Sequence, residues 1–140
     1  MHFPLLRFVL VCHEVIEGEA GLPDAYGVLS EVTIASQPGE PQFFELSLDI
    51  LVSIYTEDEN ETYQIDLAVK APSGHEGGVG TIRLGNVDGR FVSTFAGPLD
   101  IEMDTPGTFW IKVYYHGRLL GEVPLKVNFL QALSDSEAVN

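Results

Sequence analysis

The residues that could do chemistry are few and scattered along the chain. Cys12 is followed directly by His13, a nucleophile beside a base, but neighbours on an extended strand point to opposite faces and cannot form a dyad. The sequence also lacks the Gly-x-Ser-x-Gly turn that carries the nucleophile of many serine hydrolases. We therefore predict that the protein is not an enzyme and that Cys12 is a small buried side chain.

Metal ligands are equally dispersed. The four histidines show no paired spacing; they are His2, His13, His75 and His116. His13 and Glu14 could hold a metal only with ligands from elsewhere in the fold. Asp58, Glu59 and Glu61 offer oxygen ligands, but their spacing is not that of a calcium-binding loop, so a solvated hairpin tip is the expected structure. We predict no metal and no cofactor.

Two other sequence features could indicate a binding or catalytic site: a glycine-rich stretch and pairs of acidic residues. The glycines at 74, 77, 78 and 80 are not followed by Lys-Ser or Lys-Thr, so they do not form a phosphate-binding loop. The 21 acidic residues make accidental pairs of carboxylates certain, so a carboxylate-based hydrolase cannot be judged from sequence.

Charge and cysteine content restrict the partners and the compartment. The 140-residue chain has a formal net charge of −14, which opposes binding to phosphate backbones and to anionic membranes. A single cysteine allows no internal disulfide.

The segment 1–12 has an apolar run but only Arg7 beside it and no small-residue cleavage site, so we read it as a strand and not as an export signal. No apolar stretch reaches the ~20 residues of a membrane-spanning helix. We expect a soluble, cytoplasmic protein that binds neither nucleic acid nor membrane.

The strongest structural signal is an alternation of period two. Apolar side chains occupy the even positions from Phe44 to Ile54, with polar ones between them and Leu51 as the exception; residues 63–69 repeat the pattern at odd positions. We predict two strands that each bury one face, joined through the polar residues 57–60 as an antiparallel hairpin. Leu48 and Leu67 are expected in the core.

The rest of the chain also indicates strands. We expect them at Leu5–Ile16, Tyr26–Ala35, Thr81–Leu84, Phe91–Phe95, 99–103, Phe109–Tyr115 and Leu119–Phe129. Loops are predicted at Glu17–Asp24 and at the glycine-rich Ala71–Gly80, and a turn at Asp88-Gly89. One short helix is allowed at 129–138. The chain thus predicts one all-β domain at 1–130 with a polar tail at 131–140: a two-sheet antiparallel β-sandwich of about seven or eight strands, Ig-like or jelly-roll-like.

The last hairpin allows a prediction of register. A two-residue turn at His116-Gly117 would set Ile111 against Glu122 and place a carboxylate on the apolar face. A three-residue loop would set Val113 against Leu119 instead, so that every pair matches, and we favour it.

This register turns a set of binding-type side chains away from the core. Trp, Tyr and Arg are the residues most enriched at binding hot spots, and we take this set as the candidate interaction surface: Trp110, Tyr114, Arg118 and Leu120. Arg118 is expected to stack on Tyr114. The alternative is that the final hairpin is central and that both of its faces are covered by the domain itself.

Two regions of the sequence resemble a known family. The first is Phe8–Cys12 with the acidic loop and Tyr26-Gly27-Val28 that follow; the second is Pro106–Trp110 with His116–Leu125. Together they resemble an uncharacterised bacterial and phage family of small β-sandwich proteins, across most of residues 5–128. The resemblance implies a fold and a bacterial or phage origin, but it supplies no catalytic residues.

Three functions remain after these exclusions. The first is a non-catalytic β-sandwich that acts by protein–protein interaction or self-association. The second is a small-ligand or carbohydrate-binding module, and the third is an unrecognised hydrolase. A deep polar pocket would favour the second or third, whereas an apolar patch or a free strand edge would favour the first.

Overall fold

The computed structural model describes residues 3–18, 23–36, 44–57, 61–85, 91–103 and 105–131, and nine strands lie within them. The strands are β1 (Leu5–Glu17), β2 (Pro23–Val28), β3 (Glu31–Ser36), β4 (Phe44–Tyr55), β5 (Thr62–Lys70), β6 (Glu76–Gly85), β7 (Val92–Met103), β8 (Gly107–Tyr115) and β9 (Arg118–Gln131).

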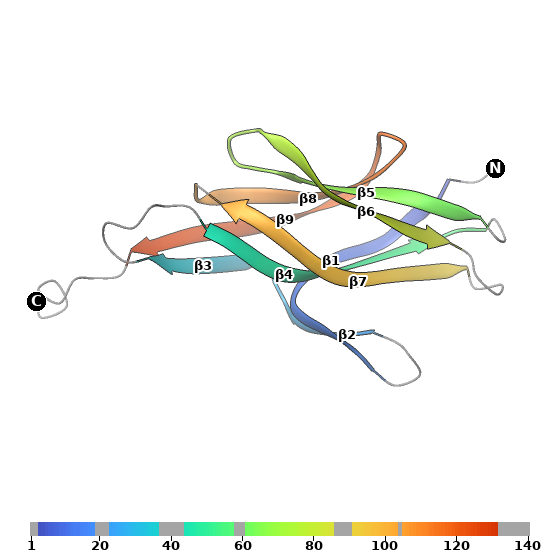
Figure 1. The fold of residues 1–140 in the computed structure, drawn as a ribbon, viewed down its shortest axis with the longest axis horizontal. Helices are drawn as coiled ribbons and strands as arrows, with labels where there is room; N and C mark the ends of the chain where they lie inside the picture. The colour runs from blue at the N-terminus through green and yellow to red at the C-terminus, as the bar shows by residue number, and fades with distance from the viewer. Residues whose placement is uncertain are drawn as a thin grey trace, which may run out of the picture.

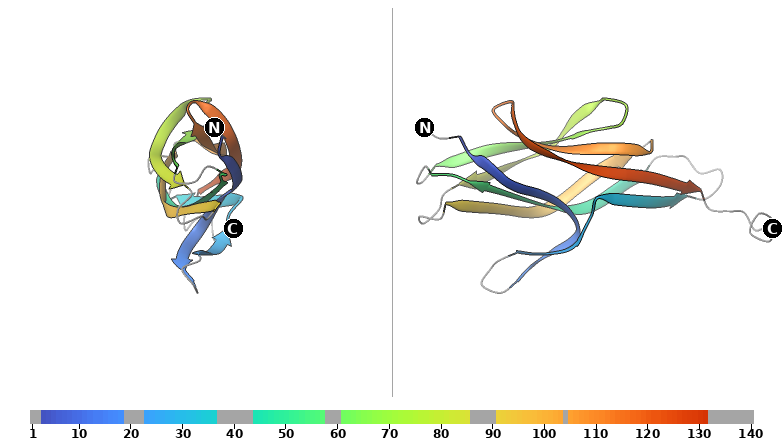
Figure 2. Two further views of the ribbon diagram at one scale, coloured as in Figure 1. Left: turned by 90° about the vertical axis from the view of Figure 1, so that its right-hand side faces the viewer. Right: turned by 180° about the vertical axis from the view of Figure 1, so that it is seen from behind.

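The strands form two sheets that face each other, as the end-on view in Figure 2 shows. Sheet A has the order β2-β1-β4-β7 and sheet B the order β3-β9-β8-β5-β6. The predicted all-β sandwich is therefore confirmed, with nine described strands in place of seven or eight. Strands β9-β8-β5 on one sheet and β4-β7 on the other follow the order of the central strands of an immunoglobulin fold. One pairing is not antiparallel, because β3 runs parallel to β9.

The predicted hairpin between β4 and β5 is wrong. β4 pairs with β1 and β7 in sheet A, whereas β5 pairs with β6 and β8 in sheet B. The connection after Tyr55 crosses from one sheet to the other, so the apolar faces of both strands join one core. The hydroxyl of Thr56 donates a hydrogen bond to the hydroxyl of Tyr63 at 2.9 Å inside the protein. Alternation identifies the buried face of a strand but not its neighbours, which explains the error.

The predicted strand Tyr26–Ala35 is two strands in different sheets. β2 pairs with β1, and β3 pairs with β9. The chain changes sheet at the two residues between them: the amide of Leu29 donates to the carbonyl of Val11, and the carbonyl of Ser30 accepts from the amide of Lys126. β2 and the end of β1 project from the body as a two-stranded ribbon (Figure 1). The loop predicted at Glu17–Asp24 is shorter than expected, because Pro23 and Asp24 belong to β2.

The predicted loop Ala71–Gly80 is also too long. A tight turn closes at once, since the amide of Ala71 donates to the carbonyl of His75 and the amide of Gly74 to the carbonyl of Ala71. β6 then begins at Glu76 and pairs with β5 along its glycines, with a register shift beside Val79. Glycine weakens a strand but does not prevent it from pairing.

The core lies between the sheets and contains the predicted alternating faces. Leu48 and Leu67 are buried, as are Leu99, Ile101 and Met103. The outer face of β4 is less exposed to solvent than predicted. Ser53 is fully buried there. Its hydroxyl oxygen accepts hydrogen bonds from the guanidinium of Arg7 and from the hydroxyl of Thr94.

The final hairpin exists, but neither predicted register is correct. His116 and Gly117 both have positive φ, 49° and 74°, as a two-residue type I′ turn requires. Tyr114 then opposes Leu119, and a bulge at Leu120 shifts the register so that Ile111 opposes Val123.

The bulge solves the problem that favoured a three-residue loop. It moves Glu122 to the outer face, opposite Lys112. It also sets Gly121 against Val113, where a Cβ would collide with the side chain of Leu6. A larger residue at this position would force the side chain of Leu6 to move, so the approach of Leu6 to β9 favours glycine here.

Some predictions fall outside the described residues. These include the Asp88-Gly89 turn and most of the tail. The possible helix at 129–138 is wrong at its start, because β9 continues to Gln131; its remainder is not described.

Truncation of Leu48 tests the assignment of the core face of β4. Leu48→Ala should lower the free energy of unfolding by about 2–5 kcal/mol, the usual cost of emptying a buried leucine site. The same change at Leu130, which is 60% exposed, should cost less than about 1 kcal/mol. Urea unfolding measures both. Equal losses would show that the inward face of β4 is assigned wrongly.

The type I′ turn gives a second prediction. Gly117→Ala should destabilise the protein by roughly 1–2 kcal/mol, because an L-residue resists positive φ. The matched control is Gly78→Ala, where the added methyl group meets open space and the free energy of unfolding should change by less than about 1 kcal/mol. If thermal unfolding ranks the two variants in the opposite order, the turn is not type I′.

Candidate interaction surface

Two of the four predicted surface residues share the outer face of sheet B. Trp110 pairs with Pro124 on one side and with Lys70 on the other, and Tyr114 pairs with Leu119 and Asp66. β8 lies between β5 and β9, so the rings are half-buried by neighbouring side chains rather than free. The alternative that the final hairpin is central is therefore correct for its strand pairing, while its outer face still reaches solvent.

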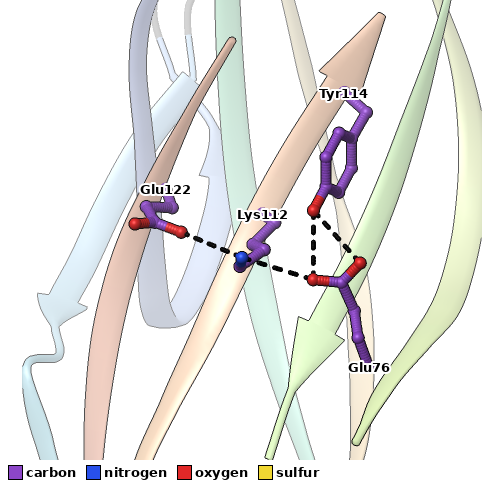
Figure 3. Close-up of polar contacts among 4 residues, drawn as sticks. All are labelled: Glu76, Lys112, Tyr114 and Glu122. Carbon is purple, nitrogen blue, oxygen red and sulfur yellow. Dashed lines mark hydrogen bonds and ion pairs between the residues drawn. The ribbon is translucent and has the colours of Figure 1, made fainter. Parts of the chain in front are cut away.

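A polar network holds this face together (Figure 3). The Nζ of Lys112 lies 3.3 Å from a carboxylate oxygen of Glu76 and 3.4 Å from one of Glu122. The phenol of Tyr114 donates to the carboxylate of Glu76, at 3.0 and 3.1 Å from its two oxygens. The ammonium group of Lys112 thus ties β8 to β6 and β9, and Glu76 adds Tyr114 to the network.

The network changes the proton affinity of its members. Burial alone would lower the pKa of Lys112, but the hydrogen bonds and charges of Glu76, Tyr114 and Glu122 outweigh it and raise that pKa. The pKa of Tyr114 is raised by burial and then by its hydrogen bond to, and repulsion from, Glu76. Both groups therefore hold their protons more tightly than in the unfolded chain.

The other two predicted surface residues lie elsewhere. Leu120 is the bulged residue and packs against the core. Arg118 pairs with Tyr115 and turns to the opposite side from Tyr114; its guanidinium lies over the ring of Phe3, 5.1 Å from the centroid. The predicted stacking of Arg118 on Tyr114 is wrong, because the two-residue turn pairs Arg118 with Tyr115 and so places the side chains of Arg118 and Tyr114 on different faces.

Arg118 instead belongs to an exposed apolar cluster at one end of the sandwich. Arg118, Phe3, Leu5, Tyr55 and Glu57 line a hollow of about 340 Å³. Phe91 extends the cluster through its ring contact with Tyr55, with 6.2 Å between centroids, and Val92 pairs with Tyr55. We call this surface the end patch; it consists of Phe3, Leu5, Tyr55, Phe91, Val92 and Arg118.

The end patch is unusual for its exposure. Phe3 is 54%, Leu5 62%, Phe91 47% and Val92 42% exposed. Scattered exposed apolar residues need no explanation, but a contiguous group from the starts of β1, β7 and β9 and the end of β4 does. The sequence contains one signal of it: Tyr55 stands at an odd position in β4, out of phase with the buried even positions.

The chemical candidates from the sequence are not brought together. Cys12 is fully buried, and burial, with a smaller contribution from Asp49, raises the pKa of its thiol, which makes it a poor nucleophile. Its neighbour His13 is exposed. No group of three or more potential metal ligands lies within the described ranges, and Asp58 and Glu59 fall outside them.

The part of the chain that the structure describes has no helix long and apolar enough to cross a membrane.

Comparisons with known proteins give fold similarity alone. No family model and no curated protein matches the sequence, so the family resemblance stays a prediction. An immunoglobulin-like protein from Pseudomonas aeruginosa is 15% identical, with a TM-score of 0.43 over 91% of this chain and 98% of that one. The alkylpurine DNA glycosylase AlkC from Pseudomonas fluorescens, bound to DNA with an abasic site analog, is 14% identical, with a TM-score of 0.41 over 71% of this chain. The match spans only 28% of the glycosylase.

The network on sheet B predicts a dependence on alkaline pH. Because the pKa of Tyr114 is raised from its ordinary value of 10.0, its stabilising contribution is complete below pH 10 and is lost as the pH rises through the folded-state value. The pKa of Tyr55 is raised as well, by burial and by the neighbouring Glu57, so absorbance at 295 nm should show more than one late-ionising tyrosine. Tyr114→Phe should remove one of them, and Glu76→Gln should make that one ionise earlier. Tyr26→Phe, which removes an exposed ring, should retain it. A Tyr114→Phe profile without the loss of a late phase would contradict the network.

Proposed function

We propose that this domain is a non-catalytic binding module whose interface with another protein is the end patch. The observation that carries the proposal is a contiguous group of four large, exposed apolar side chains. Phe3 and Leu5 line a hollow with Arg118, and Phe91 and Val92 join them through Tyr55. Contiguous exposed apolar surface of this kind marks interaction sites, and aromatic residues and arginine supply most hot spots.

The arrangement of the end patch suits a protein surface. Phe3 is braced from two sides, by the guanidinium of Arg118 and by the ring of Tyr115 at 5.9 Å between centroids. A braced ring loses little conformational entropy on binding, so more of its contact energy appears as affinity. The net charge of −14 opposes approach of a second copy, so another protein is favoured over self-association.

A second candidate function is supported by the hollow itself. A volume of about 340 Å³ lies within the range of small-ligand sites, and the aromatic rings beside the opposite charges of Arg118 and Glu57 could hold a ligand that is largely apolar with a polar end. We also propose a cytoplasmic location for the protein, which is supported by its single, buried cysteine, Cys12.

Paired surface variants test the proposed interface. Leu5→Ser with Phe91→Ser should leave the free energy of unfolding within about 1 kcal/mol of the unmodified domain, since both side chains are exposed. The same double variant should lose its protein partner in quantitative affinity capture from source cells. Val28→Ser with Leu130→Ser, at 58% and 60% exposure away from the end patch, is the matched control and should retain it.

The same samples separate the alternatives. Retention of every partner by the end-patch variant would sink the proposal. Loss of a concentration-dependent dimer in sedimentation, with no other protein captured, would assign the surface to self-association. Binding of a small metabolite to the unmodified domain but not to Arg118→Ala would favour the ligand-binding function.

A further inference from the structure

A second hollow, of about 500 Å³, lies where the open edges of the two sheets face each other. One wall is the start of β6, at Gly77, Gly78 and Val79. The other is the end of β7 with the start of β4, and core side chains such as Phe109 form the floor. We call this hollow the β6–β7 cleft. It is separate from the end patch, with which it shares no lining residue.

The β6 edge is the most approachable strand edge among the described residues. β2, β3, β6 and β7 end the two sheets. β2 and β3 have only six residues each, and β7 carries Pro98, a common protection of an edge strand. β6 has ten residues and no proline; its charged residues, Glu76 and Arg83, and its bulge at Val79 leave the glycines of its first half as the open part of the edge. A Cβ added at Gly77, Gly78 or Gly80 would meet nothing within 4 Å, so another backbone can come close there.

The opposite wall of the cleft carries unbalanced negative charge. Glu45 and Glu102 stand directly opposite each other on β4 and β7, a pairing of like charges that destabilises a sheet. Asp100 lies beside them and accepts a hydrogen bond from Ser47 at 2.7 Å. Among the described residues, none of these three acids makes an ion pair, whereas Glu76 and Glu122 pair with Lys112. A cationic side chain brought between them would relieve the repulsion.

We propose that the β6–β7 cleft binds an extended, lysine- or arginine-rich segment of another protein, which adds to β6 as a further strand. Backbone hydrogen bonds to the β6 edge would give affinity, as in other cases of strand addition. Alternate side chains of the guest strand point to one face. Long basic side chains spaced by two would extend past the β7 edge toward Asp100 and Glu102, which line the cleft from the outer face of sheet A. This site goes beyond the end patch and does not depend on it.

Synthetic peptides test the proposal directly. The probe is a fluorescein-labelled, capped heptapeptide of alternating valine and lysine. Its binding to the 140-residue chain is measured by fluorescence anisotropy at low salt. It should bind, and its analogue with glutamate in place of lysine should not. Two further peptides are N-methylated, one at its odd-numbered amides and the other at its even-numbered amides. At least one of them should fail to bind, because a strand needs free amides to pair.

Variants of the chain locate the site. Glu45→Gln with Asp100→Asn and Glu102→Gln should weaken binding about 10-fold, the combined effect of three screened charge pairs. Val79→Lys should abolish it by placing a like charge on the edge. Val28→Lys, the same change on exposed β2, should bind as the unmodified chain does.

Several results would overturn the proposal. These are failure of the lysine peptide to bind, equal binding of the glutamate peptide, equal binding by Val79→Lys, and unchanged affinity of both N-methylated peptides. A dimer that forms without peptide and is lost in Val79→Lys would assign the edge to a second copy instead. The Leu5→Ser with Phe91→Ser variant should bind the peptide normally, which keeps this test independent of the end patch.

Discussion

The apolar faces of β4 and β5 meet across the two sheets, so each strand has its own neighbours: β1 and β7 for β4, and β6 and β8 for β5. Ile54 and Ile65 are both fully buried in one core, although they lie in different sheets. Between them in sequence, the buried hydrogen bond from Thr56 to Tyr63 satisfies two hydroxyl groups at the crossing point. If β4 and β5 formed a hairpin instead, their apolar faces would lie in one layer and would need a separate cover.

The crossing also creates both proposed binding surfaces. Since β4 ends in sheet A where β5 begins in sheet B, Tyr55 comes to lie near the starts of β1 and β7, and Arg118 joins them from the last turn. Because β6 pairs only with β5 and β7 only with β4, their outer edges remain open and enclose the β6–β7 cleft. Binding surfaces at the end and at the open edge leave the packed core intact.

Alternation of side chains predicted which residues are buried better than which strands are neighbours. Leu48 and Leu67 were placed correctly because period two fixes the face of a strand. The partner of each strand depends on long-range packing that a short window does not contain. The final hairpin illustrates this limit: the bulge at Leu120 moved Glu122 to the outer face, and the two-residue turn placed Arg118 on the opposite side from Tyr114. The end patch escaped prediction because its members come from four separate segments of the chain.

Nuclear Overhauser effects between backbone protons test the central arrangement most directly. The structure predicts cross-strand contacts that join Leu48 to Leu99 in sheet A and Leu67 to Val113 in sheet B. It predicts no ladder of backbone contacts between β4 and β5. A regular ladder that starts at Ile54 and Tyr63 and continues along both strands would contradict the crossing, and with it the end patch and the β6–β7 cleft.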